Sequence, residues 1–105
     1  QVERIQKKNP ELFLVGVIND EVVAVVMGAF DGRRGYVHHL AVIPKHQRKG
    51  YGILIMEELH KRFKNENIHK IHLFIEKNNE GIIKFYKKIG WFVRSDLEMM
   101  SYVPE

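Results

Sequence analysis

The chain has 105 residues, of which 45% are hydrophobic and 29% charged, and its 17 basic and 13 acidic side chains give a formal net charge of +4. This length suits one small domain with a modest core. The absence of cysteine excludes disulfides and thiolate metal sites, and no apolar run approaches the ~20 residues of a membrane-spanning helix. We therefore expect a single globular domain over residues 1–105, located in the cytoplasm.

The first half of the chain has the pattern of β-strands joined by tight turns. Residues 2–8 are the exception, because their apolar positions suit the end of a helix that stops before Pro10. Farther on, runs of β-branched residues are separated by the turn formers Asn19 and Asp20 and by Asp31 with its following glycine. We expect an antiparallel meander with strands over residues 12–18, 22–30 and 35–43.

The second half changes to a helical period. Ile53, Met56, Leu59 or His60, and Phe63 lie on one stripe and predict a helix over residues 53–63. A short strand follows over residues 70–75, and a crossover of this length makes it parallel to the strand before the helix. The predicted sheet is therefore mixed.

The last third predicts a second helix and a final pair of strands. Asn79 suits an N-cap, and Gly90 suits the glycine that follows a helix end. Beyond it, residues 91–94 and 97–103 are predicted to form a terminal antiparallel pair.

The stretch from His46 to Gly52 joins the third strand to the first helix. Two glycines one residue apart, placed before a helix, let backbone N–H groups turn toward one point, where the helix dipole adds partial positive charge. This arrangement favours phosphate binding. The dinucleotide pattern G-x-G-x-x-G and the P-loop pattern G-x-x-x-x-G-K-[ST] are both absent. The pattern present is Q-x-x-G-x-G, made by Gln47, Gly50 and Gly52.

Q-x-x-G-x-G after a strand resembles the acetyl-CoA loop of the GNAT (Gcn5-related N-acetyltransferase) superfamily. Residues 79–91 resemble the second signature of this family, N-x-x-A-x-x-x-Y-E-K-x-G-F, with Asn79 and Tyr86 seven residues apart. Lys87 and Trp91 replace the usual Glu and Phe. The resemblance runs from about residue 12 to the C-terminus and is closest to small stand-alone bacterial members, here without the usual first strand and helix.

This resemblance implies an α/β (α+β) acyl-CoA N-acyltransferase fold, with a mixed central sheet, an antiparallel meander, a β-α-β crossover and flanking helices. It also implies acetyl-CoA as cosubstrate. In the family, the strand before the loop offers main-chain bonds to pantetheine, and the loop amides hold the pyrophosphate. The residues implied for the cofactor are Leu40, Ala41, Val42, Gln47, Arg48, Lys49, Gly50, Tyr51, Gly52, Ile53, Asn79 and Tyr86.

The resemblance implies that Tyr86 is the general acid that protonates the CoA thiolate, although its helical spacing alone suits an apolar stripe. The general base is less defined, because Tyr36 and Phe74 stand where other members carry a carboxylate. His38 shares a strand face with Tyr36, and imidazole titrates near neutral pH. His38 is therefore the first candidate for the base, and Glu76 is the second.

We predict an N-acetyltransferase that transfers the acetyl group from acetyl-CoA to a primary amine by direct attack in a ternary complex. One alternative is a non-catalytic CoA-binding interaction module with the same fold. Another is a basic nucleic-acid-binding module, because basic residues concentrate in three runs, 45–49, 61–70 and 84–88. Solvated helix faces that attract an anionic cofactor explain these runs more simply.

The remaining expectations concern metals and partners. No metal is expected, because His38 and His39 should point to opposite faces of a strand and no carboxylate accompanies them. The acceptor is an unidentified small-molecule or protein amine, and neither nucleic acid nor a membrane is expected as a partner. A homodimer is left open, because a missing first strand would leave one sheet edge unpaired.

Overall fold

The computed structural model describes residues 4–8, 12–31 and 33–104. The elements follow one another in the order β1, β2, β3, β4, η1, α1, β5 and α2. They fall into two units, Gln1–Phe74 and Ile75–Glu105, and each unit is described by itself. Within the described ranges, neither helix combines the length and the apolar character that crossing a membrane requires.

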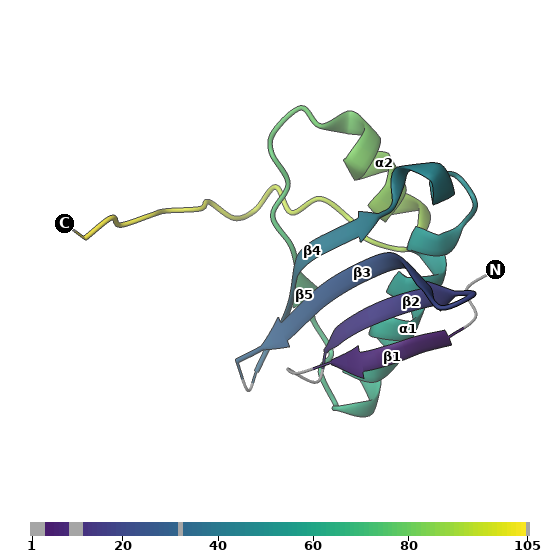
Figure 1. Ribbon diagram of the computed structural model, residues 1–105. Helices are drawn as coiled ribbons and strands as arrows, with labels where there is room; N and C mark the ends of the chain where they lie inside the picture. Colours follow the sequence, from purple (N-terminus) through teal and green to yellow (C-terminus); the bar gives the residue numbers. More distant parts are fainter. Residues whose placement is uncertain (1–3, 9–11, 32, 105) are drawn as a thin grey trace. The chain divides into compact units, whose positions relative to one another are not determined.

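The first unit is built on a five-stranded sheet in the order β1-β2-β3-β4-β5 (Figure 1). The strands are β1 (Arg4–Lys8), β2 (Phe13–Ile18), β3 (Glu21–Phe30), β4 (Gly35–Val42) and β5 (Ile71–His72). The first four pair antiparallel in sequence, whereas β4 and β5 pair in parallel. The predicted mixed sheet, with a meander and a crossover, is confirmed.

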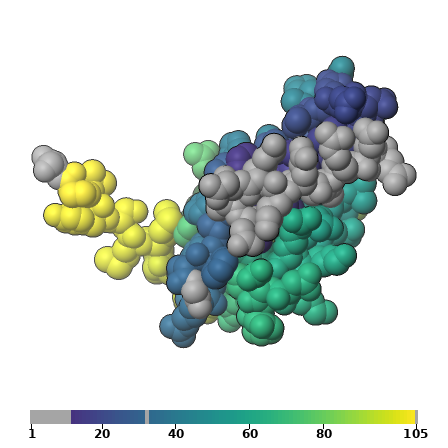
Figure 2. All heavy atoms as spheres, turned by 60° about the horizontal axis from the view of Figure 1, so that its bottom comes forward, coloured from purple at the N-terminus to yellow at the C-terminus, as the bar shows by residue number. Residues whose placement is uncertain are grey.

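Helix α1 (Tyr51–Asn65) makes the crossover from β4 to β5 and covers one face of the sheet (Figure 1). Its inward side chains Ile55, Met56, Leu59 and Phe63 are fully buried. They remove apolar surface from water together with fully buried residues of the strands, among them Leu14 and Val26. Figure 2 shows α1 from another direction, in teal and green.

The predicted turn at Asn19 and Asp20 is confirmed, whereas the predicted turn at Asp31 and Gly32 falls partly outside the described residues, because Gly32 is not among them. Asn19 and Asp20 both have left-handed backbone, with φ of 49° and 64°, as a two-residue hairpin turn requires. At the next turn, the Asp31 carboxylate accepts backbone N–H bonds from Arg33 and Arg34, at 3.0 and 2.9 Å. These bonds, first that from Arg34, lower the pKa of Asp31.

The prediction of a helix end over residues 2–8 is wrong for Arg4–Lys8, which form β1, while residues 2 and 3 lie outside the described residues. Its five residues are too few for a stable helix without strong packing. They pair instead with β2, whose edge would otherwise expose unsatisfied backbone groups, from Arg4 opposite Val17 to Lys8 opposite Phe13. The edge strand on this side of the described sheet is thus β1 instead of β2, and the homodimer stays a prediction.

Strand β5 is shorter than predicted. It spans Ile71–His72 instead of residues 70–75, and its partners are Gly35 and Tyr36 at the start of β4. The register of β4 against β3 shifts after the next residue, between the pair of Val37 with Gly28 and the pair of His39 with Met27. A bulge turns its strand away from the neighbouring strand, so the parallel pairing ends here.

In the second unit, helix α2 (Glu80–Lys88) has both predicted ends. The Asn79 side chain accepts a bond from the Ile82 N–H at 3.3 Å. At the other end Gly90 is left-handed, with φ of 103°, and donates to the Lys87 carbonyl, while the Trp91 N–H donates to the Tyr86 carbonyl. This pair of bonds is a Schellman motif.

The predicted terminal strand pair is wrong, because residues 91–104 contain no strand. Arg94 forms two hydrogen bonds with the carboxylate of Asp96, at 3.0 and 2.9 Å, and the chain bends at Asp96. From Phe92 onward, the large apolar side chains of this segment are exposed, including Met100 and Tyr102. Two short strands without a packed face are marginal in water, so the alternating pattern alone did not suffice.

Candidate functional site

The edge of β4 beyond Tyr36 is the first feature of the candidate site. On one side, β4 pairs with β3 along its whole length. On the other side, among the described residues, β5 pairs only with Gly35 and Tyr36. Residues 37–42 therefore present backbone hydrogen-bonding groups at an edge that no strand of the described sheet occupies.

The direction of these groups follows from one hydrogen bond. The Ile43 N–H donates to the Val23 carbonyl of β3 at 2.9 Å. Because backbone groups alternate along a strand, those of Ala41 also face β3, whereas those of Leu40 and Val42 face the open edge. Leu40 and Val42 thus direct backbone groups to the open edge, as the main-chain bonds implied by the family resemblance would require, whereas the main chain of Ala41 faces β3.

The Gln47 side chain forms a hydrogen bond with the last residue of this edge. Its Nε2 donates to the Val42 carbonyl at 3.0 Å, and its backbone N–H donates to the Pro44 carbonyl at 3.2 Å, at the end of the short helix η1 (Pro44–His46). Gln47 therefore fixes the path from β4 into the loop. The Val42 carbonyl is occupied by this bond, which leaves the groups of Leu40 and the Val42 N–H at the edge.

The loop itself has the backbone of an anion-binding site. Arg48 and Gly50 both have left-handed conformations, with φ of 66° and 85°. Alternation of left- and right-handed residues turns successive N–H groups toward one concave side. The first hydrogen bond of α1 is donated by Leu54 to the Gly50 carbonyl, at 3.0 Å. The amides of Gly52 and Ile53 precede this bond and point out of the helix N-terminus.

The loop has room for a ligand at Gly50. A Cβ built there would meet no protein atom within 4 Å. Arg48 and Lys49 are exposed beside it. Open space, left-handed backbone and basic side chains suit a phosphate group, so residues 48–53 are a candidate anion-binding loop.

Charged and aromatic contacts connect the residues before the loop to the start of β3 and to the start of α1. Glu21, the first residue of β3, lies 3.3 Å from the Lys45 Nζ and 3.9 Å from the His46 Nε2. The His46 ring is 5.8 Å from the ring of Tyr51, the buried first residue of α1. These contacts link the β2–β3 turn to the start of α1.

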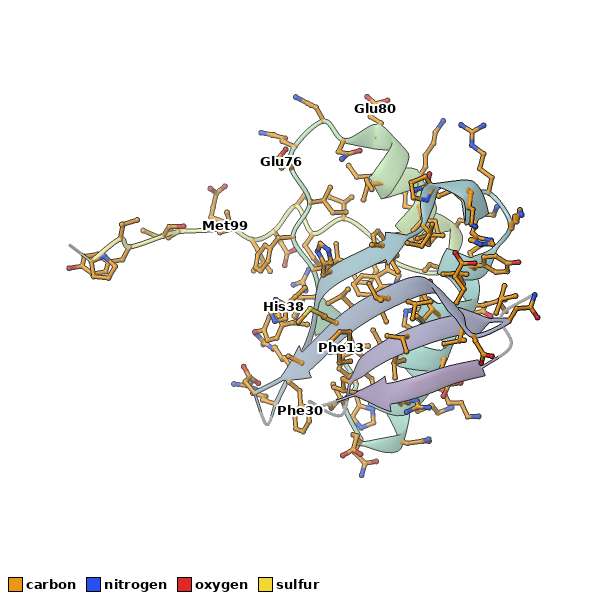
Figure 3. All side chains as sticks on the ribbon, viewed as in Figure 1. Phe13, Phe30, His38, Glu76, Glu80 and Met99 are labelled. Atoms are coloured by element: carbon orange, nitrogen blue, oxygen red, sulfur yellow. The ribbon has the colours of Figure 1, made fainter. Side chains whose placement is uncertain are left out.

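His38, the first candidate for the base, is exposed at the bulge of β4. Its ring stacks on that of Tyr36, with centroids 6.2 Å apart and planes inclined by 22°. Figure 3 shows His38 on the side of the sheet away from α1. Val37 pairs with Gly28 and His39 with Met27, so the bulge puts His39 on the same side. The predicted divergence of His38 and His39 is therefore wrong.

The remaining predicted residues belong to the second unit. Asn79 caps α2 through its side-chain oxygen. Tyr86 is buried, and its ring makes edge contacts with Phe85 and Trp91, at centroid distances of 5.1 and 5.4 Å. Burial raises the pKa of the Tyr86 phenol, because the charged form is poorly solvated there. Glu76, the second candidate for the base, is exposed.

Sequence reasoning missed two features of this site. The Gln47 bond to the Val42 carbonyl has no sequence signal beyond the motif itself. The bulge at His38 could not be predicted either, because the residue pattern of β4 is that of one regular strand. In the described part of the chain, no group of three or more His, Cys, Asp or Glu side chains could hold a metal ion.

Comparisons with known proteins agree with this geometry. A sequence model of the acetyltransferase (GNAT) family matches residues 1–91. An acetyltransferase of Pectobacterium atrosepticum is 35% identical over 90 residues, which are 86% of this chain and 64% of that protein. The chain thus spans somewhat less than two thirds of this relative.

Two solved structures show the same fold. Ard1 from Thermoplasma volcanium superposes with a TM-score of 0.77 at 25% identity, over 83% of this chain and 60% of that one. Naa50 from Arabidopsis thaliana, in complex with the bisubstrate analogue CoA-Ac-MVNAL, superposes with a TM-score of 0.69 at 27% identity, over 76% of this chain and 56% of that one. The family match, the fold and the loop agree, and the chain belongs to the acetyltransferase (GNAT) family.

Proposed function

We propose that this chain carries the cofactor half of an N-acetyltransferase that uses acetyl-CoA and acetylates a primary amine. The observation that carries the proposal is the continuity of the open β4 edge with the loop of residues 48–53. The groups of Leu40 and Val42 that face this edge suit the amides of pantetheine. The loop and the N-terminus of α1 suit the pyrophosphate.

The chemistry is direct attack of a neutral amine nitrogen on the thioester carbonyl in a ternary complex. A C–N bond forms, the C–S bond breaks, and the amine loses a proton while the sulfur gains one. Holding both reactants in line supplies much of the rate enhancement, about 7–11 kcal/mol in favourable cases. The residues therefore serve chiefly to position the reactants and move protons.

Tyr86 is the proposed acid, and His38 is the proposed base. The raised pKa of Tyr86 keeps its phenol protonated at neutral pH, so that it can donate to the departing thiolate. His38 is exposed on β4, where its imidazole can accept the amine proton directly or through water. Asn79 is proposed to add a cofactor contact to its capping bond.

The acceptor is a primary amine of a small molecule or a protein. The solved Arabidopsis neighbour contains an analogue that joins CoA, an acetyl group and a peptide. Peptide N-termini are therefore the first acceptors to screen, with small-molecule amines beside them.

A Tyr86→Phe variant tests the proposal. Loss of the general acid should lower kcat for amine-dependent CoA release by roughly 100-fold or more, while the affinity for CoA stays near the wild-type value. Tyr102→Phe is the matched control, because Tyr102 is exposed in the C-terminal segment and should keep full activity.

The alternative is a module that binds CoA without turnover. It is favoured by one observation, that Tyr36 and Phe74 stand where the family resemblance places a carboxylate base. Wild-type protein that binds CoA tightly but acetylates no amine of the panel would support this alternative. Full activity in Tyr86→Phe would instead contradict the assigned role of Tyr86.

A further inference from the structure

Tyr36 lies between two imidazole rings at the point where β4 and β5 part. Its ring stacks on His38 of its own strand, with centroids 6.2 Å apart, and is tilted against His72 of β5, at 6.0 Å. Tyr36 and His72 are also register partners in the last pair that joins the two strands. The Tyr36 ring is therefore held from the neighbouring strand and is half-buried.

His38, in contrast, has no register partner on the neighbouring strand β3. The pairs Gly28 with Val37 and Met27 with His39 leave His38 as the extra residue of the bulge. An exposed side chain at this place has several rotamers open to it. The Tyr36 ring restricts them, because rings stacked at such distances attract each other and leave less room for other orientations.

We propose that Tyr36 is a positioning residue whose ring holds the His38 imidazole in the orientation that accepts the proton of the acceptor amine. The proposal rests on the proposed function, in which His38 is the base. The Tyr36 ring orients the imidazole, and the Tyr36 hydroxyl is not needed for this. Tyr36 occupies a position where the family resemblance places a carboxylate, so the proposed base of this chain lies two residues farther along β4.

Paired substitutions separate the ring from the hydroxyl. Tyr36→Phe keeps the ring and should leave kcat near the wild-type value. Tyr36→Leu removes the ring and should lower kcat roughly 10- to 100-fold, because small misplacements of a reacting group have effects of this size. KM for acetyl-CoA should be unchanged in both. Equal losses of kcat in the two variants would overturn the proposal, since the hydroxyl would then be the active group.

A double-mutant cycle tests whether Tyr36 acts through His38. In a His38→Gln background, adding Tyr36→Leu should lower kcat no further, because no imidazole is left to position. Losses that multiply would overturn the proposal. An unchanged kcat in His38→Gln alone would overturn it too, while wild type without any acetylation would instead refute the proposed function.

Proton NMR tests the geometry without any activity. The Tyr36 ring current should displace the His38 imidazole resonances relative to those of His39, its exposed neighbour and internal control. The displacement should persist in Tyr36→Phe and disappear in Tyr36→Leu. If Tyr36→Leu does not fold, ring-to-ring NOEs between Tyr36 and His38 in the wild type decide the question, and their absence would overturn the stack.

Discussion

Gly35 is the residue at which the start of β4 packs most tightly against α1. A Cβ built at this glycine would lie 2.6 Å from Cε1 of Phe63, whose ring is fully buried. That ring has little freedom to withdraw, so no side chain fits here without displacement.

We predict that Gly35→Ala lowers the free energy of unfolding by about 1–3 kcal/mol, because it overpacks the core. Gly81→Ala is the control, since a Cβ at Gly81 in α2 would meet no atom within 4 Å. It should stabilise the protein by about 0.5–1 kcal/mol through helix propensity. Urea unfolding of the two variants checks both signs, and equal stability of Gly35→Ala and wild type would contradict the packing described.

The raised pKa of Tyr86 predicts that the free energy of unfolding depends on pH at alkaline values. Its pKa is raised in the folded state because the phenolate would be poorly solvated, whereas the unfolded phenol ionises near its ordinary value of about 10. Its contribution to stability is therefore fully present below about pH 10 and is lost as the pH rises through the folded pKa.

We predict that unfolding free energies of wild type fall more steeply above about pH 10 than those of Tyr86→Phe. For the same reason, ionisation of Tyr86 should not lower kcat at neutral or mildly basic pH, so the pH–rate profile should not fall there because of this residue. Urea titrations and pH–rate profiles of both proteins are the measurements. A limb below about pH 9 that Tyr86→Phe removes would contradict the raised pKa.

At the scale of the elements, α1 is organised by one buried stripe. Sequence spacing left Leu59 and His60 as alternatives, and the structure buries Leu59 fully. His60 is half-buried, and burial lowers its pKa, partly opposed by the charge of Glu57. Ile55, also fully buried, was not part of the predicted stripe, because the width of the covered face depends on the sheet beneath it.

We predict that Leu59→Ala costs about 2–5 kcal/mol of stability, because the lost contacts leave a cavity between α1 and β3. Leu54→Ala is the matched control in the same helix, since Leu54 is 41% exposed and should cost far less. Thermal unfolding of the two variants gives the comparison. Similar losses at both positions would mean that α1 does not face the sheet as described.

The elements also show what a sequence can predict. The meander, the crossover helix and both ends of α2 carry local signals, namely alternation, turn residues and capping residues. The strand identity of Arg4–Lys8, the bulge at His38 and the short β5 depend on which backbone groups meet across the sheet. Local patterns do not contain that information, so these were found only in the structure.

At the scale of the molecule, each unit carries its own set of candidate residues. The first unit holds the β4 edge, the loop and His38, all predicted as a set from one motif and its preceding strand. The second holds Asn79 and Tyr86, predicted from the other motif. Motif spacing is thus sufficient to predict candidate residues, which stay predictions, whereas the orientation of backbone groups at Ala41 and Val42 required the sheet register.

The measurement that tests the central claim most directly is a thermal-shift titration with acetyl-CoA of wild type, Gly50→Ala and Gly90→Ala. Both glycines are left-handed, with open space around a built Cβ, so both alanine variants should lose about 1–2 kcal/mol from backbone strain. Only Gly50 lies in the loop. Acetyl-CoA at 100 times its Kd should add about 2.7 kcal/mol of stability to wild type and Gly90→Ala, and much less to Gly50→Ala. No stabilisation of wild type at millimolar acetyl-CoA, or equal stabilisation of all three proteins, would contradict a cofactor site at this loop.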